Sequence, residues 1–425
     1  MSEKVQGVRG MNDVLPEQTF AWRHLEQSFA NCLSQYGYQE IRFPLVESTQ
    51  LFKRTIGEVT DIVEKEMYTF TDLNGDSITL RPEGTAGCVR ACLEHGLLHN
   101  QQQKLWYCGP MFRHEKPQKG RYRQFYQLGV EALGIAGVGI ELELIAICKR
   151  LWEQLDITNV VRLQINTLGE LSERHAYREA LINYLKPYFE QLDDDSKRRL
   201  NKNPLRILDS KNPDMQSIIQ KAPKLIDVIS KPSRQHFLAV CKGLDALGIS
   251  YTVNPFLVRG LDYYGHTVFE WVTDKLGSQA TVCAGGRYDK LIEQVGGNPT
   301  PAVGFAMGIE RLLLLRETIA AEQFKEPPPF IYFIAVGDEA LQQALVLAET
   351  LRNAEHQWNI IVHTSGGSFK SQFKKADKSG ARFALILGSD EVSQRQVGIK
   401  DLRHSEEQKT IPQHELTQYI KSQLE

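Results

Sequence analysis

A long helical stretch interrupts a chain that otherwise alternates strand-like runs with turns, and this order limits the folds that the chain can adopt. The segments KLWYCGPMF and RQFYQLGVEALG have the composition of strands, and so has YTVNPFLVRG much later. Between them, residues 171–247 are mostly helical in pattern. Strands on both sides of such a stretch favour one sheet interrupted by an inserted helical domain, although the helices could also simply pack on the sheet.

Two strong local signals precede the helical stretch. An apolar stripe that includes Leu25, Phe29 and Leu33 predicts a helix over residues 17–36. An Asn-Gly pair at positions 74–75, between two strand-like runs, predicts a β-hairpin. The first half of the chain therefore predicts antiparallel strands with flanking helices.

The last hundred residues have a different rhythm. Three prolines in FKEPPPF predict a stiff spacer, because proline fixes the backbone in an extended form. Beyond the spacer, strand-like and helical segments alternate as βαβαβ, which predicts a small α/β domain with some parallel pairing over residues 330–425.

Bulk properties exclude several classes of protein. The net charge is −2, so any contact with a nucleic acid must come from local patches. The first residues lack an apolar signal segment and no run is long enough to span a bilayer, so we expect a cytoplasmic protein without membrane contact. Seven scattered cysteines fit a reducing compartment, and without zinc-ligand spacing they predict no structural metal.

The usual glycine-rich phosphate motifs are missing, so a nucleotide would have to be held by side chains. In FRHE, Arg113 and Glu115 alternate on a predicted strand and share one face. They could hold a phosphate and an exocyclic amine, or form a solvated ion pair. The basic loop that follows, with Lys116 and Arg121, could contact a phosphate backbone or be merely solvated.

Other charged residues lie in apolar surroundings. Glu83 in RPEGTAG is best explained, by itself, as a first-turn helix carboxylate. Gln127 and Glu131 share a strand face that could meet water or an NH-bearing ligand. Arg311 could hold a phosphate or cap a neighbouring element. In LVRGLDYYGHTVFEW, Arg259 and two adjacent tyrosines are threaded into an apolar strand, where they could face a charged ligand.

Taken together, these motifs resemble those of the class II aminoacyl-tRNA synthetases. FRHE with RQFYQLGVE is similar to the second motif of that class, GFAMGIERLLLL to the third, and the first helix with QEIRFPLVES to the first motif at the dimer interface. LVRGLDYY and AGGRYDKLIEQVGG resemble the two peptides particular to the histidyl-tRNA synthetase family, and RPEGT matches as well. Gly265, His266 and Lys290 depart from the usual pattern, but they lie beside the matched positions.

The resemblance implies an α+β fold with three parts. Residues 1–325 would form a class II catalytic domain, with an antiparallel sheet of six or seven strands and a helical insertion at 171–247. Residues 330–425 would form an anticodon-binding α/β domain. The resemblance also implies a homodimer that uses ATP with Mg²⁺, L-histidine and tRNA(His), forming histidyl-adenylate with release of pyrophosphate and then charging the 3′ end of the tRNA.

The resemblance further implies residue roles. Arg259 and Arg113 would be catalytic. The ATP-binding residues would be Arg113, Glu115, Phe125 and Arg311. The histidine-binding residues would be Glu83, Thr85, Gln127, Glu131, Arg259, Tyr263, Tyr264 and Tyr288. The tRNA-binding residues would include Lys116, Gln118, Arg121, Lys370 and Lys374.

Two alternatives stay open at this point. The segment KSQFKKADKSGAR carries five basic residues against Asp377 alone, which fits either a solvated helix face or an anticodon contact. A non-catalytic relative, such as the regulatory subunit of histidine biosynthesis or a regulatory kinase domain, also resembles this catalytic core. The presence of Arg113, Arg259 and Arg311, followed by a full C-terminal domain, favours an active synthetase. Another class II synthetase is disfavoured by LVRGLDYY.

Overall fold

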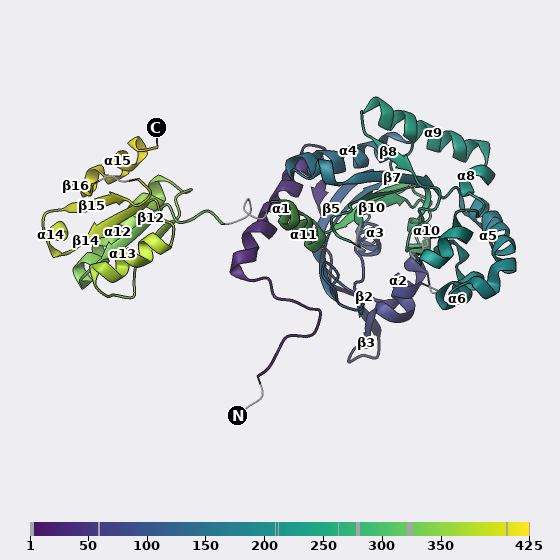
Figure 1. Ribbon diagram of the computed structural model, residues 1–425, viewed down its shortest axis with the longest axis horizontal. Helices are drawn as coiled ribbons and strands as arrows, with labels where there is room; N and C mark the ends of the chain where they lie inside the picture. Colours follow the sequence, from purple (N-terminus) through teal and green to yellow (C-terminus); the bar gives the residue numbers. More distant parts are fainter. Residues whose placement is uncertain are drawn as a thin grey trace. The chain divides into compact units, whose positions relative to one another are not determined.

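The computed structural model describes residues 4–57, 60–208, 210, 212–261, 263–277, 281–320, 326–404 and 407–424. The chain divides into two compact units, Met1–Phe324 and Lys325–Glu425 (Figure 1). Asp262 of LVRGLDYY, and Phe324 and Lys325 of the predicted spacer, lie outside the described residues. Within the described part of the chain, no helix is long and apolar enough to cross a membrane.

The larger unit is built on one eight-stranded sheet, which confirms the predicted antiparallel architecture. Six strands pair antiparallel, and a short strand is added in parallel at each edge. In spatial order the strands are β1 (Gln39–Glu40), β5 (Gln103–Phe112), β6 (Gln124–Leu133), β11 (Ala302–Gly308), β10 (Thr281–Arg287), β9 (Gly265–Val272), β7 (Arg162–Thr167) and β8 (Tyr251–Val253).

Four helices cover one face of this sheet. They are α1 (Pro16–Ser34), α4 (Gly139–Gln154), α9 (Lys231–Ala246) and α11 (Ile309–Ala320). The predicted apolar stripe of α1 is buried at Leu25, Phe29 and Leu33. The helix begins at Pro16, where the side chain of Gln18 accepts the Leu15 N–H at 3.0 Å.

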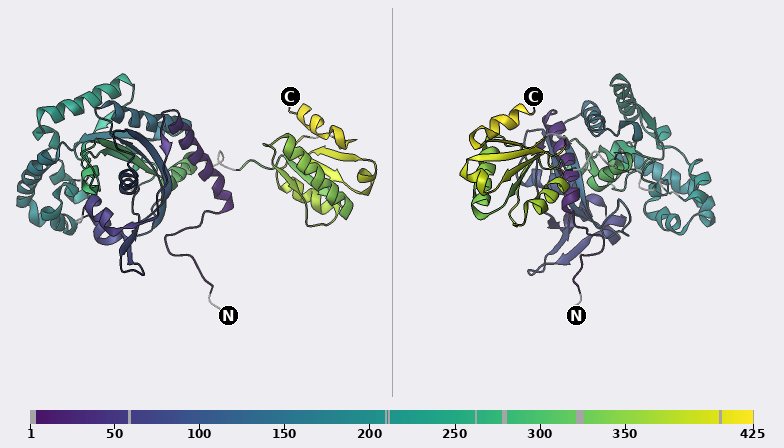
Figure 2. Two further views of the ribbon diagram at one scale, coloured as in Figure 1. Left: turned by 180° about the vertical axis from the view of Figure 1, so that it is seen from behind. Right: turned by 60° about the vertical axis from the view of Figure 1, so that its left-hand side comes forward.

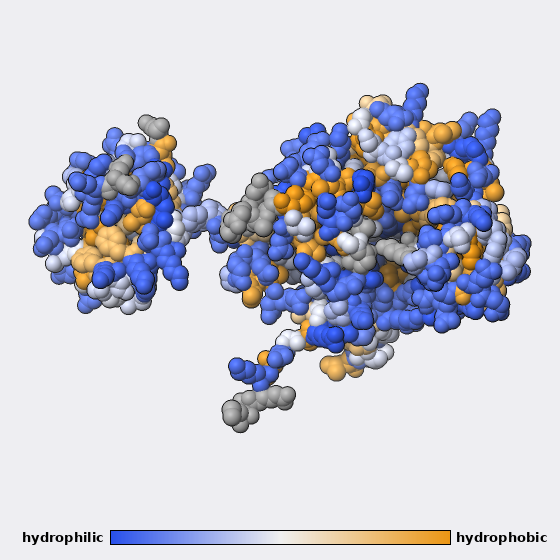
Figure 3. Space-filling model, in the orientation of Figure 1, coloured by the Kyte–Doolittle hydropathy of each residue, from blue (hydrophilic) through white to orange (hydrophobic). Residues whose placement is uncertain are grey.

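Shorter elements lie on the other side of the sheet. Helix α3 (Thr85–Glu94) lies within the curve of the sheet in both Figure 1 and Figure 2. A small sheet is formed by β2 (Val46–Ser48), β4 (Ser77–Leu80) and β3 (Tyr68–Thr71). Helix α2 (Thr49–Ile56) follows β2 along the chain, and α10 (Leu291–Val295) packs against α2 and α3. The β3–β4 hairpin confirms the Asn-Gly prediction, and its exposed Phe70 and Leu73 form an apolar patch at the lower end of the unit (Figure 3).

The region predicted to be helical contains α5 (Leu171–Leu185), α6 (Asp194–Lys202), α7 (Gln216–Ile219), α8 (Leu225–Val228) and α9. The helices α5, α6 and α8 gather to one side of the sheet in Figure 1. Buried Leu181 and Leu200 of these helices belong to the same apolar cluster as Val258 and Tyr288. The insertion and the sheet therefore fold around shared side chains.

Two strand predictions were wrong at their ends. β5 ends at Phe112, so Arg113 and Glu115 lie in a loop, where the Glu115 N–H turns back to the Arg113 carbonyl at 2.7 Å. LVRGLDYY is also irregular, because β8 ends before it and β9 begins after it. The side chain of Asn166 donates to the carbonyl of Leu257 at 3.0 Å, so this backbone group is satisfied without a neighbouring strand.

The smaller unit is a five-stranded sheet with helices, which confirms the predicted α/β rhythm. Strands β13 (Ile360–Val362), β12 (Ile331–Ala335) and β14 (Phe383–Leu387) are parallel, and β15 (Gln396–Asp401) and β16 (Lys409–Pro412) continue the sheet antiparallel. The helices are α12 (Asp338–Ala354), α13 (Phe369–Lys378), α14 (Ser389–Ser393) and α15 (Leu416–Ser422).

Candidate active site

A cavity of about 300 Å³ lies in the larger unit against β6, β10, β11 and the first turn of α11. It brings together residues from motifs that lie more than two hundred positions apart along the chain, from Glu83 to Arg311. The sequence-predicted residues that line it are Glu83, Thr85, Arg113, Glu115, Arg121, Phe125, Gln127, Arg259, Tyr263, Tyr264 and Arg311. Two other predicted residues, Glu131 and Tyr288, do not line the cavity but lie just behind Thr85.

Two arginines are fixed at one end of the cavity. The guanidinium of Arg113 lies over the ring of Phe125, 5.2 Å from its centroid, and its Nε donates to the carbonyl of Pro82 at 2.8 Å. Nη1 of Arg311 donates to the carbonyl of Thr281 at 2.8 Å. Burial lowers the pKa of Arg113, and burial with neighbouring arginine charges lowers the pKa of Arg311 to about 10. Arg311 therefore stays cationic at neutral pH.

Arg259 approaches the cavity from the irregular segment before β9. It forms a close ion pair with Glu270 and lies over the ring of Tyr264, 5.3 Å from the centroid. Burial alone would lower the pKa of Arg259, but Tyr264 and Glu270 outweigh burial and raise it. Its buried Nε has no hydrogen-bond partner among the described residues, so a ligand oxygen at this point would satisfy a costly unpaired donor.

Two buried acceptor groups, those of Gln127 and Glu83, also belong to the lining of the cavity. The side-chain oxygen of Gln127 is buried without a partner in the described part of the chain, and it would suit an N–H donor. Glu83 accepts the backbone N–H groups of Thr85 at 2.7 Å and Ala86 at 3.0 Å. Glu83 thus caps α3, as its position in the sequence suggests, and also lines the cavity. Burial raises the pKa of Glu83.

Glu131 is the centre of a cluster of hydroxyl groups. Its Oε1 accepts from Thr85 at 2.7 Å and from the Tyr107 hydroxyl at 3.0 Å, and its Oε2 accepts from the Tyr288 hydroxyl. Burial raises the pKa of Glu131 to about 8. Gly304, which lines the cavity, lies so close to this carboxylate that a Cβ would overlap it. Only glycine therefore lets Glu131 approach the cavity wall.

Sequence reasoning noted Glu270 among the polar residues of LVRGLDYYGHTVFEW but gave it no role, and it missed Tyr107. Glu270 pairs with Arg259, and Tyr107 donates to Glu131. Glu270 carried a usable signal, since it is a lone charge between Phe269 and Trp271 in an apolar strand. Tyr107 carried no such signal, because an aromatic residue in a strand is ordinary.

The charges of the cavity favour an anionic ligand. Its lining includes four arginines, Arg113, Arg121, Arg259 and Arg311, and four glutamates, Glu83, Glu115, Glu270 and Glu310. Burial raises the pKa of Glu310 to about 7, so part of the negative charge is neutralised at neutral pH. Arg121 forms an ion pair with Glu115 at the cavity edge, so its side chain faces the cavity.

The pKa of Glu310 predicts a dependence of stability on pH. An unfolded chain releases this proton near the usual pKa of 4.5, whereas the folded chain holds it up to about pH 7. The stabilisation from this group is thus full below pH 4.5 and falls as the pH rises to about 7, by roughly 3 kcal/mol at most. We expect the melting temperature of the wild type to fall relative to that of Glu310→Gln between pH 5 and 7. Glu317→Gln, exposed on the same helix, is the control, and a constant difference between wild type and Glu310→Gln would contradict the assignment.

Of the residues predicted to contact tRNA, Arg121 lines the cavity, whereas Lys116, Gln118, Lys370 and Lys374 lie apart from its lining. Lys116 and Gln118 are exposed in a loop that folds back on itself through paired backbone bonds between Gln118 and Arg121. Lys370 and Lys374 are exposed on α13 of the smaller unit. This exposure fits both a solvated helix and a surface for a polyanion, so their role stays a prediction.

Comparisons with known proteins agree over nearly the whole chain. A family described as histidyl-tRNA synthetase matches residues 10–312, and a family described as anticodon binding domain matches residues 331–423. A histidine–tRNA ligase of Legionella pneumophila (strain Philadelphia 1) is 66% identical over 422 residues, or 99% of each chain.

Solved structures of similar proteins have the same fold. A structure of apo S. aureus histidyl-tRNA synthetase has a TM-score of 0.81 and 35% identity, covering 98% of this chain and 100% of its own. A histidyl-tRNA synthetase from Nostoc sp. PCC 7120 has a TM-score of 0.70, 20% identity and coverage of 99% and 100%, so it supports the fold alone.

Proposed function

The chain belongs to the histidyl-tRNA synthetase family, and on that premise we propose that it is a histidine–tRNA ligase that activates L-histidine with ATP and charges tRNA(His). In the first step the histidine carboxylate attacks the α-phosphorus of ATP, which forms histidyl-adenylate and releases pyrophosphate. In the second step a ribose hydroxyl at the 3′ end of the tRNA attacks the adenylate. The second domain, over residues 331–423, would bind the anticodon.

One observation carries the proposal: Gln127 and Arg259 line the same cavity, and each has a buried polar atom without a partner among the described residues. The buried Oε1 of Gln127 suits the α-ammonium of an amino acid, and the buried Nε of Arg259 suits an anionic oxygen of its carboxylate or of a phosphate. With Arg113 and Arg311 in the same lining, the cavity has what an amino acid and a triphosphate together require.

The adenylation chemistry needs positioning and positive charge rather than an acid–base pair. A carboxylate is already ionised at neutral pH, so no general base has to activate it. We propose that Arg259 and Arg113 meet the α-phosphate from opposite sides and stabilise the charge that develops on its oxygens. Glu270 holds the Arg259 guanidinium in place, which reduces the reorganisation needed during the reaction.

For ATP, we propose that Arg311 binds the γ-phosphate and stacks on adenine, with Phe125 on the other face and Glu115 accepting from the adenine amine. Phe125 already has the Arg113 guanidinium over its ring. Adenine stacked on Phe125 would therefore lie beside the α-phosphate that Arg113 is proposed to bind. The carboxylates of the cavity already accept hydrogen bonds or ion pairs, as Glu115 does from Arg121. Mg²⁺ would therefore be held chiefly by the phosphates of ATP, whose charge it neutralises.

For histidine, we propose that Glu83, Thr85 and Gln127 take the α-amino group and that Glu131 and Tyr264 pair the two ring nitrogens. Tyr263 and Tyr288 would complete the pocket. A site that pairs both nitrogens rejects side chains without them by a factor of about 10⁴, because its own buried groups would stay unpaired. In the transfer step, a phosphate oxygen of the adenylate itself would take the proton of the attacking hydroxyl.

Contact with tRNA would use two basic surfaces. We propose that Lys116, Gln118 and Arg121 meet the acceptor stem, and that Lys370 and Lys374 meet the anticodon arm. Lys370, Lys374 and Lys378 are four residues apart on one helix, so they form a single basic face.

Reversing the charge of this face gives a direct test of the tRNA contact. The double variant Lys370→Glu and Lys374→Glu should weaken tRNA binding about tenfold to a hundredfold at low salt, and the loss should shrink as salt rises. ATP–pyrophosphate exchange should be unchanged. Lys421→Glu, on α15 of the same unit, is the control, and equal binding by the double variant would remove α13 from the interface.

We also propose a class II catalytic domain over residues 1–325 with an inserted domain at 171–247, a homodimer and a cytoplasmic location. The dimer is supported by two exposed apolar side chains, Leu45 (41%) and Val46 (39%), in the segment that resembles the first motif. Free thiols at the seven cysteines fit a reducing compartment.

The decisive assay for the proposed function is histidine-dependent ATP–pyrophosphate exchange, followed by charging of tRNA(His). We expect exchange with histidine and none with other amino acids. A protein that binds histidine but supports neither reaction would be a regulatory relative instead.

A further inference from the structure

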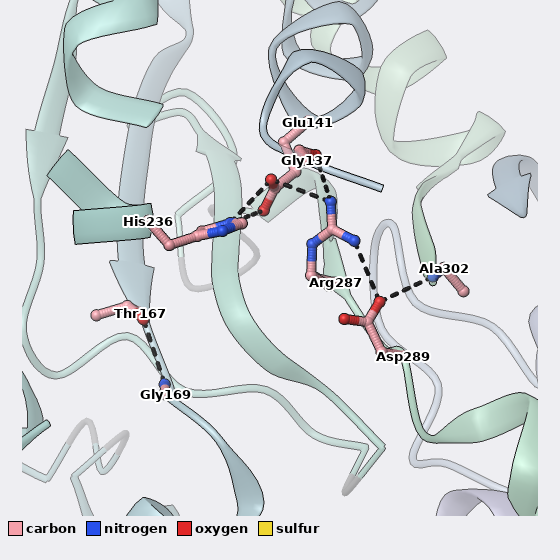
Figure 4. A network of polar contacts seen from close by, with 8 residues as sticks. All are labelled: Gly137, Glu141, Thr167, Gly169, His236, Arg287, Asp289 and Ala302. Atoms are coloured by element: carbon pink, nitrogen blue, oxygen red, sulfur yellow. Dashed lines mark hydrogen bonds and ion pairs between the residues drawn. The ribbon is translucent and has the colours of Figure 1, made fainter. Parts of the chain in front are cut away.

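A polar network of Glu141, His236, Arg287 and Asp289 lies where β10, α4 and α9 meet, and Tyr288 stands between two of its members in the sequence (Figure 4). Its centre is Arg287, which is only 3% exposed. Nη2 of Arg287 donates to Glu141 at 3.1 Å and to the carbonyl of Gly137 at 2.8 Å, and Nη1 donates to Asp289 at 3.1 Å. None of these groups has a part in the chemistry described above.

His236 connects the helical insertion to this network. It lies on α9, and its Nε2 donates to both oxygens of the Glu141 carboxylate at 3.0 Å. Although burial works against ionisation, the hydrogen bond from His236 and the charge of Arg287 lower the pKa of Glu141. The His236 ring also lies against His266, with 5.2 Å between centroids, and His266 is two residues from Tyr264 of the cavity.

The network fixes the backbone on both sides of Tyr288. The same oxygen of Asp289 that accepts from Arg287 also accepts the N–H of Ala302 at 2.8 Å, and the N–H of Tyr288 donates to the carbonyl of Ala302 at 2.7 Å. Ala302 is the first residue of β11, so Tyr288 is tied to this strand at two points. Its hydroxyl is thereby directed at Glu131.

We propose that Glu141, Arg287 and Asp289, completed by His236, form a positioning network that sets the affinity for histidine by holding Tyr288 against Glu131. The inference rests on the proposed role of Glu131 in binding the imidazole. It goes further, since it gives a helix of the insertion a part in amino-acid selection.

The physical reason is the balance of charge around the buried guanidinium of Arg287, which lies between the buried Glu141 and the partly exposed Asp289. Glu141 and Asp289 share the single guanidinium of Arg287, so this guanidinium alone does not fully stabilise the Glu141 carboxylate. The hydrogen bond from His236 supplies the remaining stabilisation. Without that donor, Glu141 depends on Arg287 alone, and the Arg287–Asp289 contact that fixes Tyr288 weakens. A displacement of a binding group by even a fraction of an ångström is costly in a preorganised site.

The test uses His236, which is partly exposed and therefore replaceable. His236→Leu should raise the KM for histidine in ATP–pyrophosphate exchange about tenfold, with the KM for ATP and kcat within twofold of wild type. His236→Gln should restore most of the affinity, because its amide N–H can reach Glu141. Gln235→Leu, exposed on the same helix, is the matched control and should behave as wild type.

A double-variant cycle separates positioning from a general loss of stability. Tyr288→Phe lacks the hydroxyl through which the network acts, so adding His236→Leu to it should change the KM for histidine less than twofold. A full tenfold effect in that background, or a wild-type KM in His236→Leu, overturns the proposal. If His236→Leu does not fold, Asp289→Ala is measured in the same way, with the same expected and contradicting outcomes. Absence of histidine-dependent exchange in the wild type would instead contradict the proposed function.

Discussion

Replacing Arg259 by alanine should lower the rate of histidyl-adenylate formation by about 10³-fold, while the affinity for histidine changes less than tenfold. The guanidinium stabilises charge that develops on the α-phosphate only during the reaction, so its loss affects the transition state more than the bound substrates. The removal also leaves Glu270 without its ion-pair partner inside the cavity, which adds unfavourable negative charge beside the phosphates.

Pyrophosphate exchange measures this effect, and equilibrium binding of histidine separates it from a loss of affinity. Arg259→His should be nearly as slow as Arg259→Ala, because only the planar fork of arginine reaches two phosphate oxygens. Arg162→Ala removes an exposed arginine that pairs with Asp274 on the same sheet, and it should keep the wild-type rate. Exchange at the wild-type rate in Arg259→Ala would refute the catalytic role.

Replacing Glu131 by glutamine should raise the KM for histidine about a hundredfold and reduce discrimination against other amino acids. A carboxylate accepts at all of its lone pairs, whereas an amide turns two of these positions into donors. Three hydroxyl groups already donate to Glu131, so an amide there would face at least one of them, such as Tyr288, with the wrong polarity. Burial raises the pKa of Glu131 to about 8, but an imidazole N–H that donates to Glu131 would favour its ionised form. The expected change then corresponds to the loss of about 3 kcal/mol for a buried hydrogen bond to a charged group.

Glu143 provides a close control for this variant. Its carboxylate also accepts from a tyrosine hydroxyl, that of Tyr38 at 3.0 Å, and from Lys104, but it lies outside the lining of the cavity. Glu143→Gln should therefore leave the KM for histidine within twofold of wild type. An unchanged KM in Glu131→Gln would remove Glu131 from the histidine pocket.

Much of the fold could be predicted because its signals are local. The stripe of Leu25, Phe29 and Leu33 fixes a helix by its period alone, and Asn74-Gly75 fixes a hairpin by the backbone angles that such a turn needs. The residues of the cavity were also predicted from short segments. Arg113 and Gln127 stand in FRHE and RQFYQLGVE, which resemble the second motif of the class II synthetases.

The errors lie where the partners of backbone groups differ from those that the composition of the segment suggests. Arg113 and Glu115 continue the apolar alternation of β5, but the pairing of β5 with β6 ends at Phe112. LVRGLDYY has the composition of a strand, but the side chain of Asn166 satisfies part of its backbone. A sequence pattern records the tendency of a segment and not the identity of the group that pairs with it.

The sequence by itself determined the order of helices and strands, the presence of an inserted helical stretch, and the kinds of side chain available for binding an anion and an amino acid. Tertiary structure alone decided that Arg259 pairs with Glu270, that Glu131 is surrounded by hydroxyls, and that Glu141, Arg287 and His236 meet where β10, α4 and α9 come together. The reason is that the period of a helix or strand follows from neighbouring residues, whereas the choice among distant partners follows from the packing and register of the whole sheet.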